Sequence, residues 1–357
     1  MAVERTIERE RSGRARRTGA PCLAALDLGT NNCRLLVAEP TAEGFNVVDS
    51  FSRITRLGEG LATTGRLMES AMARTLSALR VCRRVMDRNG IVHARCVATE
   101  ACRRAANGAD FVARVERAVG IRLEVLGHEE EAALAMLGCL PLVDAHTRHL
   151  LMVDIGGGST EILWLDRAGG GKGRIAETVS VPLGVVTLSE SFGRRLANGA
   201  YDDAVGYVGG LLTRALKAGR QPAGLPSGLS PGLPDERTVQ MLGTSGTVTT
   251  LAAVHLGLRR YDRRKVDGIR LPFAAIADVG RRLRGLDEAA RAAHPCVGAE
   301  RADLVVAGCA ILDAIHAHWP VASLRVADRG VREGILSALT GRSLRQALFI
   351  ERETLPS

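Results

Sequence analysis

The chain has 357 residues, of which 46% are hydrophobic and 24% charged, and this composition excludes an intrinsically disordered protein. Its formal net charge is +9, and because only Lys172, Lys217 and Lys265 are lysines, nearly all the positive charge is guanidinium, which grips oxyanions well. No apolar run reaches the roughly 18 residues of a membrane-spanning helix, and the cysteines show no C-x-x-C spacing. We therefore expect a cytoplasmic protein with reduced thiols and no membrane partner.

The two ends of the chain differ from its middle. Residues 1–20 are rich in arginine and lack an apolar core segment, so they are predicted to form a disordered basic tail rather than a secretory signal. A second tail is expected over residues 346–357. The chain between them is long enough for two domains. Proline, glycine and serine crowd Gly219–Pro234, which is predicted to be an exposed linker or inserted loop.

The first part of the folded chain is predicted to alternate strands and helices. An apolar strand runs from Cys22 to Asp27, and apolar residues then recur at three- and four-residue steps from Met68 to Met86, as in an amphipathic helix. Glu129, Glu130 and Glu131 open a further, largely apolar helix, where the helix dipole favours acids. The other strands predicted here are Leu35–Ala38, stopped by Pro40, then Phe45–Ile54, Val92–Ala98 and Arg122–Leu126.

The stretch Leu151–Leu165 reads LMVDIGGGSTEILWL and predicts a buried strand, a tight turn and a returning strand. Asp154 ends the first strand and Glu161 opens the second. The three glycines between them carry no β-carbon, so an anion can approach their backbone N–H groups. Two carboxylates beside such a turn suggest a divalent cation that bridges to the anion.

A further glycine-containing turn follows in the last part of the chain. It is the third along the chain, after one at Gly29 and the one at Gly156–Gly158. A strand over Val239–Leu242 leads into Gly243, Thr244, Ser245, Gly246 and Thr247, and then into a helix whose N-terminus suits an anion. The remaining elements predicted in this part are a strand at Arg174–Val181, a helix over roughly Glu300–His318, a strand at Ser323–Ala327 and a helix at Val331–Leu339.

The first and central turns form an internal repeat. Asp27-Leu28-Gly29-Thr30 matches Asp154-Ile155-Gly156-Gly157 at a spacing of 127 residues, since 154 − 27 = 127. In both copies a carboxylate ends an apolar strand and glycine stands two residues later. The repeat predicts two lobes that each present one phosphate turn across a cleft. No G-x-x-x-x-G-K-[ST] or G-x-G-x-x-G motif is present, which argues against P-loop and dinucleotide-binding folds.

These segments, in this order, resemble the exopolyphosphatase/guanosine-pentaphosphate phosphohydrolase family of the actin/Hsp70/sugar-kinase superfamily. The resemblance covers roughly residues 22–340. Its most specific motif is VDIGGGSTE. The sequence departs from the family pattern at Asn32, where the family commonly has serine, and at Ser245, where it commonly has glycine. The segments that carry it are ALDLGTNNCRLLV, VATEACRRAANGADF, LGHEEEAALAMLG, VDIGGGSTEI, VPLGVVTL, LGTSGTVTTLA and VADRGVREGIL.

The resemblance implies an α/β fold of two ribonuclease-H-like, actin-like lobes. Each lobe is expected to hold a mixed five-stranded sheet flanked by helices, with a cleft between the two. The first would cover residues 21–130, completed by a C-terminal helix over 329–345, and the second residues 131–328. The chain would be a short, bacterial-type form without the C-terminal HD-type extension of longer members.

The resemblance also implies the chemistry. We expect Mg²⁺- or Mn²⁺-dependent release of terminal phosphate from inorganic polyphosphate, or conversion of pppGpp to ppGpp as in the stringent response. Glu131 would be the base that activates water, with Glu130 beside it, and Asp154, Glu161 and Asp27 would hold the metal. The phosphate-binding residues would be Gly29, Thr30, Asn31, Asn32, Arg103, Gly156, Gly157, Gly158, Ser159, Thr160 and the third turn, Gly243, Thr244, Ser245, Gly246 and Thr247.

Two alternative functions remain open at this point. The chain could be an ATP-dependent kinase of the same superfamily or a non-catalytic regulator that binds polyphosphate or the guanosine penta- and tetraphosphates. Nucleic-acid binding finds little support, because aromatic residues make up only 3% of the chain and no recognised module is present.

The basic cluster between Arg259 and Lys265 could extend a polyanion path. A homodimer is also left open.

Overall fold

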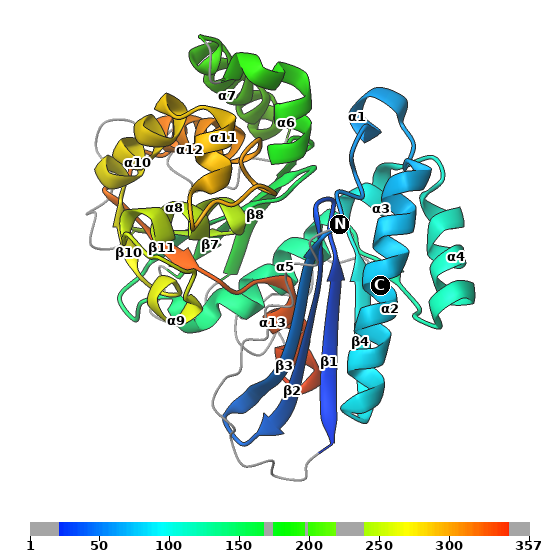
Figure 1. The fold of residues 1–357 in the computed structure, drawn as a ribbon. Helices are drawn as coiled ribbons and strands as arrows, with labels where there is room; N and C mark the ends of the chain where they lie inside the picture. Colours follow the sequence, from blue (N-terminus) through cyan, green and yellow to red (C-terminus); the bar gives the residue numbers. More distant parts are fainter. Residues whose placement is uncertain (1–20, 168–173, 197–198, 219–238, 343–357) are drawn as a thin grey trace. The chain divides into compact units, whose positions relative to one another are not determined.

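A computed structural model describes residues 21–167, 174–196, 199–218 and 239–342 (Figure 1). The predicted tails, the predicted loop Gly219–Pro234 and the turn expected near Gly169–Gly173 lie outside the described residues. Contacts divide the described chain into two compact units. The first holds the residues up to Leu134 and those from Val331, and the second holds the residues between Ala135 and Gly330.

The first unit is built on a five-stranded mixed sheet with the strand order β3-β2-β1-β4-β5. The strands β1, β2 and β3 pair antiparallel, whereas β4 is parallel to β1 and β5 is parallel to β4. Its elements are β1 (Cys22–Leu28), β2 (Asn32–Thr41), β3 (Gly44–Ile54), α1 (Leu61–Thr64), α2 (Glu69–Arg88), β4 (Ile91–Ala98), α3 (Glu100–Arg104), α4 (Gly108–Val119), β5 (Glu124–Val125), the start of α5 (His128–Cys139) and α13 (Val331–Leu339).

Helices cover both faces of this sheet. Leu26 and Leu28 of β1 belong to one buried cluster with Leu79 of α2 and Phe111 of α4. Since neighbouring side chains of a strand point to opposite faces, Asp27 lies on the other face, which α13 covers (Figure 1). The last described helix of the chain therefore completes the unit that the first strand begins.

One strand boundary differs from the sequence-based prediction. Proline was expected to stop the second strand after Ala38, but β2 continues through Pro40 to Thr41 and pairs there with β3. The pairing of β2 with β1 already ends at Ala38. The missing N–H of Pro40 therefore removes no hydrogen bond to β1, which is how proline is accommodated at a strand end.

The second unit has a six-stranded mixed sheet with the order β10-β11-β9-β6-β7-β8. It includes the rest of α5. Its other elements are η1 (Leu140–Leu142), β6 (His149–Ile155), β7 (Thr160–Asp166), β8 (Arg174–Val181), α6 (Val185–Phe192), η2 (Gly193–Leu196), α7 (Tyr201–Ala218), β9 (Val239–Thr244), α8 (Gly246–His255), α9 (Arg263–Val266), β10 (Arg270–Pro272), α10 (Phe273–Gly285), α11 (Glu288–Ala293), α12 (Val305–His318) and β11 (Ser323–Ala327).

The predicted fold class is confirmed: the protein has two mixed sheets, each flanked by helices. Two details differ from the prediction. The second sheet gains a short sixth strand, β10, at its edge. The helix expected from Glu300 begins only at Val305, because the preceding residues form turns in which Leu304 and Val305 both donate to the carbonyl of Arg301.

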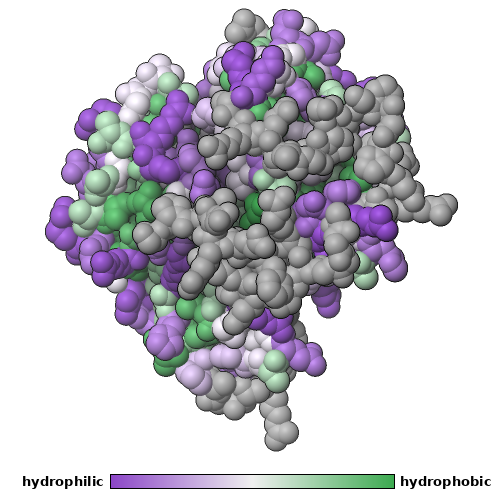
Figure 2. All heavy atoms as spheres, turned by 180° about the vertical axis from the view of Figure 1, so that it is seen from behind, coloured by the Kyte–Doolittle hydropathy of each residue, from purple (hydrophilic) through white to green (hydrophobic). Residues whose placement is uncertain are grey.

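The described surface is a mixture of hydrophilic and hydrophobic residues on the face that Figure 2 presents. Few large apolar side chains are exposed among the described residues, and they are scattered: Met68, Val92, Val125, Tyr207 and Leu256. Within the described part of the chain, no helix combines the length and hydropathy that spanning a bilayer requires.

The packing of α13 against α5 generates a first prediction. A Cβ atom at Gly334 would lie 1.9 Å from the carbonyl oxygen of Leu134, so Gly334→Ala must push two helices apart. We expect it to lower the free energy of unfolding by about 1–3 kcal/mol, measured by thermal or urea denaturation. The matched control is Gly206→Ala in α7, where a Cβ would meet nothing within 4 Å. The control should be neutral or stabilising by up to about 1 kcal/mol, and an equal loss in both variants would contradict the prediction.

Candidate active site

The turn between β1 and β2 is the first predicted phosphate turn. It is closed by a hydrogen bond of 2.9 Å from the N–H of Gly29 to the carbonyl of Asn32. A second segment lies against this turn, and its residues Thr55 and Arg56 donate their backbone N–H groups to the carbonyl of Asn31. The carbonyls of Asn31 and Asn32 are thus already bonded by the protein itself.

Glycine makes this close approach possible. Gly58 donates its N–H to the carbonyl of Thr30 at 2.9 Å, and a Cβ at Gly58 would lie 2.2 Å from the methyl group of Thr30. Thr30 and Asn31 are both buried, and their backbone N–H groups find no acceptor among the described residues. The side-chain oxygen of Asn31 is also buried without a hydrogen-bond partner in the described structure. A buried turn with unused donors is suited to an anion.

The turn between β6 and β7 repeats this arrangement in the second unit. The N–H of Gly156 donates to the carbonyl of Ser159 at 2.9 Å. The first residues of α6 then bond the turn carbonyls, Val185 to Gly156 and Val186 to Gly157. The approach is close, because a Cβ at Gly184 would lie 2.4 Å from the backbone of Gly157.

Unused backbone N–H groups are again present in the second turn. No acceptor among the described residues bonds the backbone N–H of Gly157, Gly158 or Ser159, although Ser159 is 3% exposed. Three consecutive donors form a concave anion site of the kind that binds phosphate. The hydroxyl of Thr160 differs from this pattern, since it donates to the carbonyl of Leu183 at 2.7 Å. Its predicted phosphate contact would require that bond to be exchanged.

The internal repeat seen in the sequence is therefore a repeat of hydrogen bonding. The pair Gly29–Asn32 and the pair Gly156–Ser159 stand at the same spacing of 127 residues (156 − 29 and 159 − 32) and make the same bond. In each unit the turn also follows a strand that carries a carboxylate, Asp27 in β1 and Asp154 in β6. The glycines mark both turns in the sequence, but nothing in the sequence identifies the segments whose N–H groups donate to the turn carbonyls.

The third predicted turn joins β9 to α8 and contains backbone strain. Ser245 has φ 130° and ψ 173°, a conformation that is essentially restricted to glycine. Its hydroxyl accepts from the N–H of Thr247 and so caps α8. The hydroxyl of Thr244 donates to the carbonyl of Arg329 at 2.6 Å, which fixes the end of β9. The strained position is the one at which the resemblance showed a departure from glycine.

Two of the predicted metal ligands are direct cross-strand neighbours. Asp154 of β6 lies opposite Glu161 of β7, and opposed residues of an antiparallel pair project to the same face. Glu161 is 2% exposed and accepts a hydrogen bond from Ser180 at 3.2 Å. Within the described residues no cluster of three or more acidic, histidine or cysteine side chains is close enough to hold a metal. Two carboxylates fit Mg²⁺ nevertheless, because it commonly uses one or two carboxylates and completes its shell with water and substrate phosphate.

The third predicted ligand, Asp27, has a different electrostatic setting. Burial raises the pKa of this carboxyl above its ordinary value, and the positive charges of Arg332 and Arg34 only partly offset that effect. Glu333 of α13 raises the pKa of Asp27 further. A carboxylate kept in a desolvated setting is a common feature of functional sites.

The predicted catalytic acids of α5 have distinct partners. Glu131 is 9% exposed and lies 3.1 Å from a guanidinium nitrogen of Arg103, so the two form an ion pair. Glu130 is half-exposed and is paired with Arg95, which also holds Glu124. The first unit therefore brings Glu131 and Arg103 together, whereas Glu130 belongs to a separate ion-pair network.

The basic cluster between Arg259 and Lys265 is partly occupied by the protein itself. Tyr261 donates its hydroxyl to Asp328 at 2.6 Å, and Arg263 donates to the carbonyl of the same residue. Arg264, in contrast, has a 92% exposed side chain. Part of the cluster thus holds the end of β11 in place, and only its exposed remainder is suited to a polyanion path.

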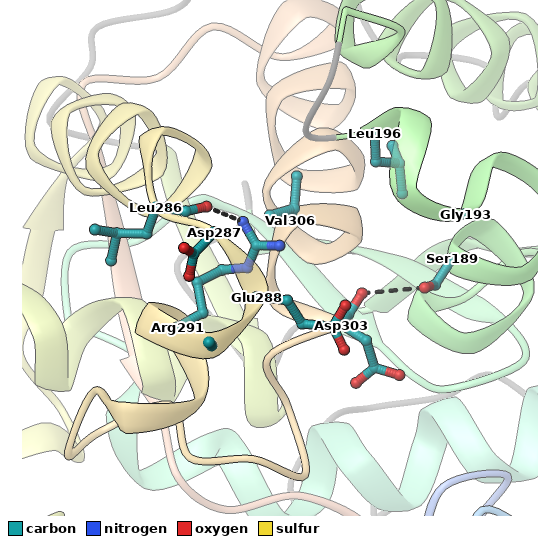
Figure 3. Close-up of a pocket in the computed structure, with 10 residues that line it drawn as sticks. Ser189, Gly193, Leu196, Leu286, Asp287, Glu288, Arg291, Asp303 and Val306 are labelled. Carbon is teal, nitrogen blue, oxygen red and sulfur yellow. Dashed lines mark hydrogen bonds between the residues drawn. The ribbon is translucent and has the colours of Figure 1, made fainter.

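A separate pocket of about 500 Å³ lies in the second unit between α6, α11 and α12 (Figure 3). None of the predicted site residues lines it. Its lining is acidic and includes Asp287, Glu288 and Asp303. The buried Arg291 also lines it, but its Nε donates to the carbonyl of Ala302 and one Nη donates to the carbonyls of Leu283 and Leu286. An acidic lining disfavours a polyphosphate chain, so this pocket does not extend the phosphate turns.

The fold and these turns define a class of protein: an α/β protein of two mixed-sheet units, each with an anion-binding turn that follows a strand-borne carboxylate. Residues 36–342 match the model of the Ppx/GppA phosphatase family. The chain belongs to this family and is a hydrolase.

Individual relatives agree with this assignment. The chain is 29% identical over 332 residues to exopolyphosphatase 2 of Mycobacterium tuberculosis, a match that covers 89% of this chain and 98% of the relative. It is 27% identical to guanosine-5'-triphosphate,3'-diphosphate pyrophosphatase of Aeromonas hydrophila over 91% of this chain and 60% of that protein. Among solved structures, the Aquifex aeolicus PPX-GPPA enzyme aligns with a TM-score of 0.69 and 28% identity, covering 89% of this chain and 99% of the other.

The strain at Ser245 generates a second prediction. Ser245→Ala removes the capping hydroxyl but keeps the disfavoured φ, and should lower the free energy of unfolding by about 1 kcal/mol. Ser245→Gly also removes the hydroxyl but relieves the strain, so it should be more stable than the alanine variant by about 1–3 kcal/mol. At an ordinary helix or strand position glycine is the less stable of the two, and that order in denaturation experiments would contradict the prediction.

The raised pKa of Asp27 generates a third prediction. Because the pKa of the folded state lies above the ordinary value, ionisation of Asp27 at neutral pH opposes folding, and this destabilisation disappears as the pH falls below the unfolded pKa. Asp27→Asn should therefore be more stable than the wild type at neutral pH, and the difference should vanish in acid. Thermal midpoints measured from pH 7 down to about pH 3, below the ordinary pKa of 3.8, test this. A variant that is less stable at neutral pH would show that Asp27 is favourably paired instead.

Proposed function

We propose that this chain is a metal-dependent phosphoanhydride hydrolase that releases terminal orthophosphate from inorganic polyphosphate, converts pppGpp to ppGpp, or does both. The observation that carries the proposal is the pair of equivalent turns, each with buried N–H donors that no described acceptor uses. Such donors suit the oxygens of a phosphate chain. The two relatives named above bear the names of a polyphosphate- and a guanosine-phosphate-cleaving enzyme, which supports both substrates.

In the proposed reaction each group of residues has one task. The N–H groups of Thr30 and Asn31 in one unit, and of Gly157, Gly158 and Ser159 in the other, hold phosphate oxygens. Water attacks the terminal phosphorus, the bridging P–O bond breaks, and the bridging oxygen leaves with the shortened chain. The carboxylate of Glu131 accepts the proton of the attacking water. Phosphoryl transfer needs little covalent chemistry from the protein, so positioning and charge stabilisation account for most of the rate.

Asp154 and Glu161 are the residues that would hold Mg²⁺, with Asp27 as a third acid. When bound, the cation would neutralise developing charge on the phosphate oxygens. The desolvated setting of Asp27 supports this role, since a nearby cation lowers the pKa of a buried carboxyl.

Phosphate release from long-chain polyphosphate and from pppGpp, each with and without Mg²⁺, tests the proposal. We expect release from at least one of the two, loss of release on chelation and recovery when Mg²⁺ is returned. No release from either substrate in the presence of Mg²⁺ would refute the proposed function. Transfer of phosphate from ATP to an acceptor would instead support a kinase.

The role of Glu131 generates a fourth prediction. A positioned base contributes about 10²–10⁴-fold, so Glu131→Gln should lower kcat by that factor while polyphosphate binding is retained. Glu129→Gln is the matched control, because Glu129 is an exposed acid in the same helical turn. Steady-state kinetics and a filter-binding assay separate the two effects. If Glu131→Gln abolishes binding, or leaves kcat unchanged, Glu131 is not the base.

A further inference from the structure

Arg103 uses every N–H donor that it has. Its Nε donates to Glu100 at 3.2 Å, and one terminal nitrogen donates to the carbonyl of Leu126 at 2.5 Å and to Glu131 at 3.1 Å. The other terminal nitrogen donates to Glu100 at 2.8 Å and meets the Nδ1 of His128 at 2.9 Å. A guanidinium has five N–H groups, and five contacts account for all of them. Direct phosphate binding by Arg103 would therefore require one of these bonds to be released.

Glu100 is the residue that anchors this arrangement. It is only 6% exposed, and one carboxylate oxygen accepts from two nitrogens of Arg103. A buried carboxylate is tolerated when it is paired and hydrogen-bonded, so Glu100 and Arg103 depend on each other. Both belong to α3, three residues apart, and this spacing brings the two side chains onto one face of the helix.

His128 contributes a ring nitrogen as a further partner of Arg103. Because a guanidinium can only donate, the Nδ1 of His128 must accept this bond, and the ring proton then lies on Nε2. That Nε2 lies 3.8 Å from the same carboxylate oxygen of Glu100. His128, the first residue of α5, is therefore hydrogen-bonded to one terminal nitrogen of Arg103. Glu131, one helical turn later, is paired with the other terminal nitrogen.

We propose that Glu100 and His128 are positioning residues that orient Arg103, and that Arg103 in turn holds the carboxylate of Glu131. The inference deepens the proposed function and depends on it for the role of Glu131. It makes Arg103 part of the support of the base, with the guanidinium plane fixed by Glu100 on one edge and His128 on the other. A residue that acts through another in this way affects turnover more than substrate binding.

Three variants test the proposal by steady-state phosphate release with polyphosphate and Mg²⁺. Glu100→Gln keeps the shape but loses the charge, and His128→Ala removes the acceptor; each should lower kcat about 10–100-fold while KM stays unchanged. His128→Asn should restore most of the activity, because its side-chain oxygen replaces the Nδ1 acceptor. The control is Glu69→Gln, which breaks an exposed ion pair with Arg114 and should leave kcat unchanged.

A second measurement does not depend on turnover. The Nε–H of Arg103, observed by ¹⁵N NMR and assigned with Arg103→Lys, should exchange slowly with water in the wild type and much faster in Glu100→Gln. Unchanged exchange in that variant would overturn the proposal. So would a raised KM with unchanged kcat, or an asparagine variant no better than alanine at position 128. If the wild type cleaves neither substrate, the proposed function fails, and the NMR result still decides whether Glu100 positions Arg103.

Discussion

The protein depends on one arrangement of hydrogen bonds, made once in each unit. Backbone N–H groups of a neighbouring segment donate to carbonyl groups of a glycine-containing turn. A tight turn normally leaves both donors and acceptors unused. Here Gly58 and the segment before it take the carbonyls of the first turn, and the start of α6, just after Gly184, takes those of the second. Backbone N–H groups remain unused in both turns, so each turn favours an anion without any charged side chain. A side chain at Gly184 would collide with the backbone of its turn, and one at Gly58 would displace the methyl group of Thr30.

The sequence was most informative where structure is local. Both turns, the strands that lead into them and the carboxylates that end those strands could be predicted, because glycine, alternating apolar residues and acids are all close together in the chain. The equivalence of the two turns also followed from sequence, since the repeat conserves the positions that make the closing bond. The fold class, in contrast, was predicted from the resemblance of seven segments to a known family.

What could not be predicted depends on contacts between distant segments. Apart from the nearby Glu100, the partners of Arg103 come from positions 23, 25 and 28 residues further along the chain, and no pattern marks them as partners. Gly184 looks like an ordinary helix start until the β6–β7 turn is placed against it. The edge strand β10 was missed because three residues, one of them proline, carry almost no strand signal. Strain at Ser245 is a property of backbone angles, which composition does not report.

The return of α13 to the first unit also orders events during synthesis. The sheet face that α13 covers is formed from strands made near the start of translation, but the helix itself leaves the ribosome only after the whole second unit has been made. At about 5–20 residues per second, that delay is on the order of 10–40 s. During this interval the first unit lacks the helix that covers this face of its sheet, whereas the second unit already has all of its own described elements. The second unit can therefore reach its native packing first.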